Sequence, residues 1–558
     1  MVLLVDFHRN PMPQIMRLQH RCADHPAIHF TETPDIFACH RLTHFANPAP
    51  SPAGPEDRRI RVEGCSLVTH DLLDVPPEEL HDDGRQRNVA HPSSFHQDPA
   101  QAPRRIEGKV TATTDPGYEQ LRREINWNQL MPTRRPQVVM QVATELDVAE
   151  AIRFARTHRM KIAVRGGGHS WVGFSLREGS LLIDLGGLKQ ISIDHEVRRA
   201  TIQPAVTGRE LNRQLAAHGL AFPVGHAPTV PLSGFLLNGG LGWNSNSWGP
   251  ACFSVEAATV ATADGQLVVA QPEQHADLLW AIRGAGPGFF GVVTQYVLKL
   301  YPTPRAITSS TYYYPLQRME EVGAWAGSVA KQLPREVELA IFVAPAPPTL
   351  TDRCRFSNGF VGILSATAFL NTEREATATL GLLESCPVAH ECLHKEMNKP
   401  TSLDALLDMG SLLWPERHRY RADTLWSDSA PAEPLAAVRD YFLHAPSPKS
   451  LALCVLSTGA DGSTAVLPEG AYSMTAATLL LCYAIWERPE DDAANTAWHR
   501  EMIAALDRFA VGHYVGESDI VTEPARAERS FARTTWQRLQ ALRRTYDPDG
   551  LFHGHFSA

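Results

Sequence analysis

The 558-residue chain lacks several features that would place it in a specialised class of protein. No run approaches eighteen consecutive apolar residues, so we expect no membrane-spanning helix. Dense Lys/Arg tracts are also absent, and a formal net charge of −9 argues against a nucleic-acid partner. The first six residues break off before the apolar core of a signal peptide can form. With 44% hydrophobic and 20% charged residues, the chain is predicted to be an ordinary globular protein of the cytoplasm.

Metal-binding patterns are missing as well. The nine cysteines form no CxxC pair and no spacing typical of zinc. Most of them stand among apolar residues, as Cys454 and Cys482 do, which is typical of reduced core residues. The histidines scattered over the first hundred residues match no ligand spacing either. We therefore predict no metal site.

The chain is too long for one core, and its pattern changes along its length. Residues 1–105 are rich in proline and show few helical or strand periods, so we expect a disordered extension. From about residue 306 to 510, candidate strands alternate with amphipathic helical stretches, which predicts an antiparallel sheet covered by helices. The candidate strands cover residues 338–343, 360–369, 451–457 and 478–486. The charged run at 415–420 is expected to be solvated, with substrate contact as the second interpretation.

The most informative stretch is residues 162–171, with the sequence IAVRGGGHSW. A strand-like apolar run leads into three consecutive glycines, which permit positive φ and a close approach of the backbone to a ligand. Backbone N–H groups in such a loop form an anion-binding concavity. His169 follows at its edge, within reach of the bound group. On its own, a flexible surface loop is the slightly better explanation.

Two further glycine runs change that balance. Residues 224–243 contain more glycines than a helix or strand interior accommodates, which indicates close contact with a large ligand. A GxGxxG motif lies at 286–291, but a helical pattern precedes it and a strand follows, the reverse of the dinucleotide-binding order. The first glycine run is also followed by a strand, at 181–185. We therefore exclude a nicotinamide-binding Rossmann domain.

Together the three runs, in this order and spacing, resemble the flavoprotein superfamily of vanillyl-alcohol oxidase and p-cresol methylhydroxylase (PCMH). The closing YDPDGLF at 546–552 resembles the berberine-bridge-enzyme branch, and the pattern is most similar to the 6-hydroxy-D-nicotine oxidase type. The resemblance extends from about residue 118 to 556. It implies an α+β fold with a two-subdomain PCMH-type FAD-binding domain over 106–305 and a substrate domain over 306–510. A C-terminal segment, 511–558, would return to the FAD-binding domain.

The resemblance also implies the cofactor and its contacts. FAD is expected to place its pyrophosphate on the glycine loop and to be bound covalently to His169. Bicovalent members carry a cysteine where this chain has Ala227, so a single link is expected. The cofactor-binding residues implied are Arg165, Gly166, Gly167, Gly168, His169, Ser170, Gly225, Thr229, Val230, Ser233, Gly234, Gly239, Gly240, Gly242, Val293, Tyr514 and His555.

The function implied is an FAD-dependent oxidase that removes hydride from a carbon bearing OH or NH of a small organic substrate. Its electrons would pass to O2, giving H2O2, with Val230 beside the flavin edge controlling access of O2. Tyr483 is the one tyrosine of the strand expected at 478–486, on the same face as Leu481 and Ile485, and we take it as the catalytic base. Glu517 is the competitor and is expected to orient the substrate. The alternatives are an O2-independent dehydrogenase or oxidative cyclase, and a non-catalytic flavin-binding protein.

Overall fold

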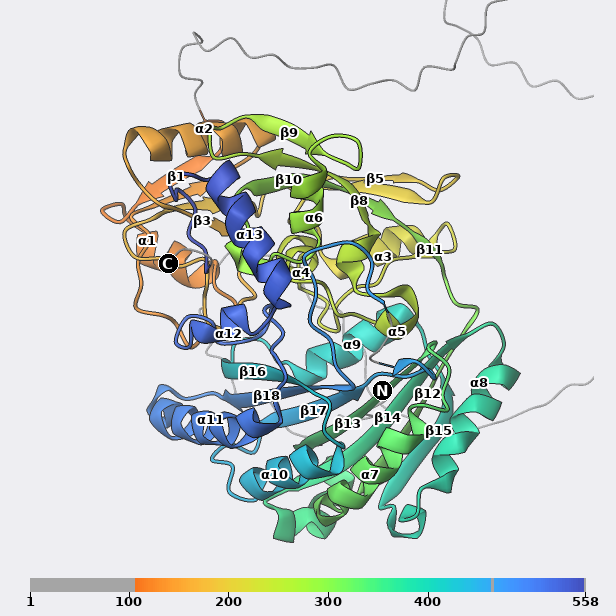
Figure 1. The fold of residues 1–558 in the computed structure, drawn as a ribbon. Coiled ribbons are helices and arrows are strands. Elements are labelled where there is room, and N and C mark those ends of the chain that lie inside the picture. The colour runs from red at the N-terminus through yellow and green to blue at the C-terminus, as the bar shows by residue number, and fades with distance from the viewer. Residues whose placement is uncertain (1–105, 463–465, 556–558) are drawn as a thin grey trace, which may run out of the picture. The chain divides into compact units, whose positions relative to one another are not determined.

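The computed structural model describes residues 106–462 and 466–555, and the expectation for residues 1–105 lies outside this part of the chain. Three main sheets organise the described residues (Figure 1). A separate two-stranded ladder joins β7 (Leu220–Ala221) and β11 (Tyr301–Pro302). No helix of the described part combines the length and hydropathy that a membrane span requires. Nor does this part gather three or more His, Cys, Asp or Glu side chains that could hold a metal ion.

The first sheet has the order β1-β2-β4-β3 and carries the glycine loop at the end of β3. Its strands are β1 (Lys109–Ala112), β2 (Val138–Gln141), β3 (Ile162–Arg165) and β4 (Leu181–Asp184), accompanied by helices α1 (Tyr118–Glu124) and α2 (Glu145–Thr157). The strands predicted before and after the loop are confirmed as β3 and β4, which pair with each other in parallel. Thr144 caps α2, and the Asp147 carboxylate completes a capping box while also accepting the backbone N–H groups of Glu107 and Gly108.

The second sheet is antiparallel, in the order β5-β6-β10-β8-β9. Its strands are β5 (Ile191–Asp194), β6 (Arg199–Ile202), β8 (Val255–Ala261), β9 (Leu267–Ala270) and β10 (Val292–Lys299). Its helices are α3 (Gly208–Ala216), α4 (Leu232–Leu237), α5 (Ser245–Trp248) and α6 (Ala276–Ile282). The GxGxxG run does lie between helix α6 and strand β10, as the rejection of a Rossmann domain requires.

The third sheet has seven antiparallel strands in the order β15-β12-β14-β13-β17-β18-β16. All four predicted strands are present, as β13 (Val337–Pro345), β14 (Phe360–Leu370), β17 (Leu451–Leu456) and β18 (Thr478–Trp486). Three strands were not predicted: β12 (Ala306–Tyr314), β15 (His394–Pro400) and β16 (Arg419–Ser427). Every residue of β12 is buried, so the strand shows no polar–apolar alternation in the sequence.

The charged run at 415–420 proves to be only partly solvated. β16 begins inside it, and the Arg419 guanidinium donates both Nε and Nη2 to the Asp492 carboxylate, each at 2.5 Å. The next residue, Tyr420, is fully buried. The expectation was wrong for these two residues, because their partner comes from a helix 73 positions later and leaves no trace in the local sequence.

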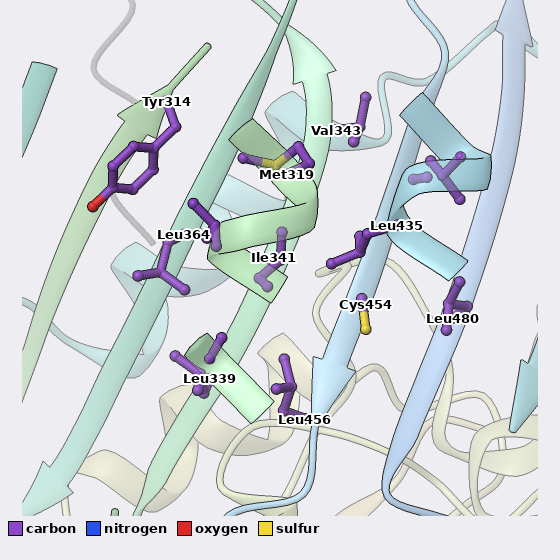
Figure 2. Close-up of a cluster of buried hydrophobic side chains, with 14 of the residues drawn as sticks. Tyr314, Met319, Leu339, Ile341, Val343, Leu364, Leu435, Cys454, Leu456 and Leu480 are labelled. Atoms are coloured by element: carbon purple, nitrogen blue, oxygen red, sulfur yellow. The ribbon is translucent and has the colours of Figure 1, made fainter. Parts of the chain in front are cut away.

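Helices cover one face of the third sheet, as predicted (Figure 1). They are α7 (Met319–Val329), α8 (Glu373–Leu380), α10 (Ala432–Phe442) and α11 (Asp492–Leu506). Figure 2 shows the core between them and the sheet, where Met319 and Leu435 from the helices meet Leu339, Ile341 and Val343 of β13. Because successive side chains of a strand alternate, Glu338, Ala340 and Phe342 lie on the opposite face, which lines the candidate site.

The last elements are α12 (Ala525–Glu528) and α13 (Arg533–Tyr546). Beyond them the chain returns to β3, where Ile162 donates its N–H to the Leu551 carbonyl and His553 donates to the Ile162 carbonyl. The turn between is held by Asp547, whose carboxylate accepts the N–H groups of Leu551 and Phe552. The C-terminal segment therefore lies directly beside the strand that carries the glycine loop.

Candidate active site

A cavity of about 400 Å³ lies between the two smaller sheets and the uncovered face of the seven-stranded sheet. One wall is the glycine loop with residues of the second glycine run. The opposite wall is formed by side chains of β13, β14, β16, β17 and β18. The C-terminal segment contributes residues 514–518 and Phe552-His553. This size falls in the range of small-molecule sites.

The glycine loop fits an anionic group because its backbone is packed from behind. A Cβ on Gly167 would lie 2.1 Å from the Pro231 ring, and one on Gly168, whose φ is +73°, would lie 2.1 Å from the Ile125 carbonyl oxygen. Within the described part of the chain, the backbone N–H groups of residues 166–170 donate to no acceptor. Free N–H groups in such a loop are the donors that a pyrophosphate requires. The loop therefore fits FAD.

Arg165 supports this loop from within. Its Nη1 lies 2.6 Å from Asp184 Oδ1, its Nε donates to the Ile125 carbonyl at 2.7 Å, and its Nη2 donates to the Gly167 carbonyl. The side chain lines the cavity, but its charge is engaged by Asp184. Arg165 thus orients the glycine loop by bonding the Gly167 carbonyl.

His169 lines the cavity with its ring stacked on Trp127, at 5.2 Å between ring centroids and 26° between planes. Burial, together with the Arg165 guanidinium, lowers the pKa of His169 to about 4. The imidazole is therefore neutral at pH 7, which is the nucleophilic form that a covalent link to a flavin needs. Trp127 was not predicted: it stands in an unpatterned segment after α1, with no sequence signal of its own.

The predicted cofactor-binding residues divide into those that line the cavity and those that do not. The predicted residues that line the cavity are Arg165, Gly166, Gly167, Gly168, His169, Ser170, Gly225, Val230, Ser233, Gly234, Gly242, Val293 and Tyr514. Thr229, Gly239, Gly240 and His555 are not among the lining residues. Gly239 packs against protein, since its Cβ would lie 2.4 Å from the Tyr472 ring. His555 stacks on Trp536 instead.

Tyr483 and Glu517 meet inside the cavity, although 34 residues separate them. The Tyr483 hydroxyl donates to Glu517 Oε2 at 2.5 Å, and Trp171 Nε1 donates to the same oxygen at 3.1 Å. Burial, reinforced by the Glu517 charge, raises the pKa of Tyr483 well above 10. Burial also raises the pKa of Glu517, against the opposing effect of its two hydrogen bonds. Among the groups that act on the pKa of Tyr483, no cation offsets this increase.

A buried asparagine holds this cluster together. Asn128 donates to the carbonyl groups of Trp171 and Tyr420 and accepts the Tyr420 N–H. The rings follow this framework: Trp171 lies 5.0 Å from Tyr420 and 5.5 Å from Tyr483, centroid to centroid. Trp171, next to the predicted Ser170, thereby connects the glycine loop to the substrate side.

A second polar pair in the cavity was also not predicted. His226 Nε2 lies 3.0 Å from Glu338 Oε1, joining the second glycine run to β13. The sequence placed His226 inside a conspicuous run, yet nothing in it announced a partner 112 residues away. Both side chains line the cavity.

Comparisons with known proteins agree with this geometry. Residues 136–271 match the FAD binding domain family. FAD-linked oxidoreductase nodO of Hypoxylon pulicicidum is 27% identical over 439 residues, covering 78% of this chain and 94% of that protein. (R)-6-Hydroxynicotine oxidase of Paenarthrobacter nicotinovorans is 26% identical over 463 residues, covering 82% and 97%.

Solved structures with the same fold include 6-hydroxy-D-nicotine oxidase from Arthrobacter nicotinovorans, with a TM-score of 0.70 at 22% identity, covering 81% of this chain and 98% of that one. BBE-like 1 of Physcomitrella patens has a TM-score of 0.68 at 18% identity, covering 80% and 96%. The chain is an FAD-linked oxidoreductase. Its fold is the PCMH-type arrangement of 6-hydroxy-D-nicotine oxidase and the berberine-bridge-enzyme-like proteins, which confirms the resemblance and fold class predicted from the sequence.

Proposed function

We propose that the protein is an oxidase that removes a hydride from a carbon bearing OH or NH of a small organic molecule and passes the electrons to O2. FAD, when bound, supplies the two-electron acceptor of this reaction. The observation that carries the proposal is the Tyr483–Glu517 pair, which places a proton acceptor inside the same cavity as the glycine loop.

The pair handles the proton that the substrate must lose. Forming a phenolate at Tyr483 is unfavourable, since its pKa is raised. Its hydroxyl, however, already donates to Glu517, so Tyr483 can accept the substrate proton while its own proton moves to the carboxylate. The charge then disappears from a buried carboxylate whose raised pKa favours protonation. Tyr483 remains the group that contacts the substrate, and Glu517 acts as the final proton acceptor.

We further propose that His169 holds FAD covalently and alone. The neutral, cavity-facing imidazole supports this, as does Ala227 at the position where bicovalent relatives carry cysteine. After denaturation and acid precipitation, the wild-type protein should stay yellow, and the flavin-bearing peptide should contain His169. His169→Ala should release any FAD it holds. Flavin mapped to a cysteine, or washed out of the wild type, would contradict the link.

Use of O2 is supported by Val230, which lines the cavity next to Pro231. Phl p 4, which has this fold at a TM-score of 0.67 and 18% identity, is described as a glucose dehydrogenase in the wild type, and a variant with isoleucine replaced by valine is described as a glucose oxidase. By the family resemblance, Val230 lies at the gate beside the flavin, and a valine there favours the oxidase over the dehydrogenase.

The test is a substrate screen with two readouts. Amines, alcohols, sugars and hydroxy acids are added anaerobically to the flavin-loaded protein, and bleaching of the flavin is followed. Any compound that bleaches it is then tested in air for H2O2. Bleaching with stoichiometric peroxide is the expected result. Bleaching without peroxide would favour the dehydrogenase, and absence of bleaching with every class would favour a non-catalytic flavin-binding protein.

A further inference from the structure

The cavity carries a second carboxylate, at a different level of the sheet from Tyr483, that the proposed reaction does not use. Glu338 projects from β13 and its side chain is only 14% exposed. Oε1 is engaged by His226 at 3.0 Å, whereas Oε2 has no hydrogen-bond donor among the described residues. Oε2 is therefore open to a hydrogen-bond donor on a ligand in the cavity, which Glu338 lines.

The sheet register shows that Glu338 lies away from the reacting carbon. Leu339, the next residue of β13, pairs with Leu456 of β17, whereas Tyr483 of β18 pairs with Leu451 of that same strand. Five residues of strand at about 3.3 Å each separate these levels by roughly 17 Å along the backbone. Glu338 and Tyr483 therefore face different ends of the cavity.

The charges that line the cavity are unbalanced. Glu338 and Glu517 are its two acidic residues, and among the described lining residues Arg165 is the only Lys or Arg. Arg165 is already paired with Asp184 at 2.6 Å. Burial lowers the pKa of both His169 and His553 to about 4, so neither supplies a positive charge at neutral pH. The third lining histidine, His226, is already paired with Glu338 at 3.0 Å. An anionic substrate finds no free cation there.

A second unsatisfied group lies at the same end of the sheet as Glu338. Trp426 of β16 lines the cavity, is 5% exposed, and its Nε1 has no hydrogen-bond partner in the described part of the chain. It pairs with Leu479, which in turn pairs with Val455, one residue from the level of Leu339. An indole that lines the cavity provides an aromatic surface of the kind on which cationic groups bind.

We propose that Glu338 selects substrates that carry a positively charged group remote from the carbon that is oxidised. Such a substrate has an ammonium group that a chain of several atoms or a ring separates from this carbon. This proposal deepens the oxidase proposed above and rests on it for the reacting end. Glu338 is thus a specificity-determining residue, whose effect falls on binding of the substrate, because a contact made equally in ground and transition states changes KM and leaves kcat unaltered.

The experiment compares three matched probes: 4-phenylbutylamine, 4-phenylbutanol and 4-phenylbutyrate. Binding to the full-length, flavin-loaded protein is measured by calorimetry at pH 8. The amine should bind at least about tenfold more tightly than the alcohol, and the butyrate more weakly than either. Glu338→Gln should abolish the preference for the amine and leave the affinity for the alcohol unchanged.

Two further variants test whether the charge at position 338 is responsible for the preference. Glu338→Asp keeps the charge and should retain most of the preference, and the exposed Glu416→Gln should retain all of it. Equal binding of amine and alcohol by the wild type, or a preference that survives Glu338→Gln, would overturn the proposal. The two hypotheses fail separately: a neutral substrate that bleaches the flavin, without amine preference, removes only the role of Glu338. An amine preference without bleaching by any substrate removes only the oxidase.

Discussion

The two walls of the cavity are built by different means. On the side of the small sheets, the ligand meets mainly backbone, as in the run from Gly166 to Ser170 with its free N–H groups. On the side of the seven-stranded sheet, the ligand meets side chains, including Glu338, Trp426 and Tyr483. A backbone surface presents the same donors whatever the neighbouring residues are, and suits a constant cofactor. A side-chain surface can be altered one residue at a time, and suits a substrate that differs between relatives.

The sharpest test of the backbone wall is Gly168→Ala. The added Cβ meets the Ile125 carbonyl at 2.1 Å, and φ is +73°, so both crowding and the left-handed conformation oppose it. We expect nearly complete loss of FAD, measured as the ratio of 450 to 280 nm absorbance in purified protein.

The matched control is Gly179→Ala. Gly179 also has a positive φ, of +65°, but nothing lies within 4 Å of its added Cβ. It should cost only about 1–2 kcal/mol of stability and keep its FAD. Equal flavin loss in both variants would mean that backbone strain, and not the shape of the glycine loop, governs retention.

On the side-chain wall, the largest effect is expected from the proton-accepting pair. Glu517→Gln removes the final acceptor, and Tyr483→Phe removes the group that contacts the substrate. Each should slow anaerobic flavin reduction by about 10²-fold or more, while FAD content stays normal. A normal rate in Tyr483→Phe with a stalled Glu517→Gln would make Glu517 the direct base.

The pH dependence gives the same pair a second signature. Glu517 must be ionised to accept the proton, so the reduction rate should rise with pH through its pKa. Burial places that pKa above the ordinary 4.5, so the rise should occur at higher pH than for an exposed glutamate. Stopped-flow reduction from pH 5 upward should show this limb in the wild type, and Glu517→Gln should lack it.

Val230→Ile tests a position where backbone and side-chain walls meet. The extra methylene should restrict access of O2 in a packed site and slow flavin reoxidation by about tenfold, with anaerobic reduction nearly unchanged. Stopped-flow mixing of reduced protein with O2 measures this. Val230→Ala is the control that should reoxidise at least as fast as the wild type, and identical rates in all three proteins would remove the gate.

The smallest effect is expected from Trp171→Phe. The variant keeps an aromatic ring beside Tyr420 and Tyr483 but loses the N–H that reaches Glu517 at 3.1 Å. A hydrogen bond to the carboxylate lowers its pKa, so its loss should raise the pKa of Glu517 and shift the acid limb to higher pH. We expect a few-fold lower rate at neutral pH that recovers at higher pH. A pH-independent decrease would indicate a packing defect instead.

This contrast explains what the sequence could predict. The backbone wall depends on consecutive residues. The glycine loop, its strands and the position of His169 could therefore be predicted from one segment of the sequence. Gly239 and Gly240 show the limit, since glycines required for packing against protein are indistinguishable in sequence from those that face a ligand.

The side-chain wall depends on partners that the chain brings together from a distance. Tyr483 and Glu517 were singled out separately, but their hydrogen bond was not predicted. Glu338 was missed because it is the first residue of the strand expected at 338–343. An isolated acidic residue at the end of a predicted strand is typical of a position that faces solvent. Its burial follows from the packing of this sheet face against the glycine runs, which no local periodicity records.

The return of the C-terminal segment to β3 determines when, during synthesis of the chain, the cofactor can be enclosed. The cavity needs Tyr514 to Ser518 and Phe552-His553, yet the glycine loop is synthesised nearly four hundred residues earlier. During translation, the glycine loop that would hold the pyrophosphate is therefore made before the C-terminal residues that complete the cavity. A chain of which only the glycine loop has been synthesised can at most hold FAD loosely. Enclosure of the cofactor, and any bond to His169, must wait until residues 514–518 and 552–553 have joined the cavity.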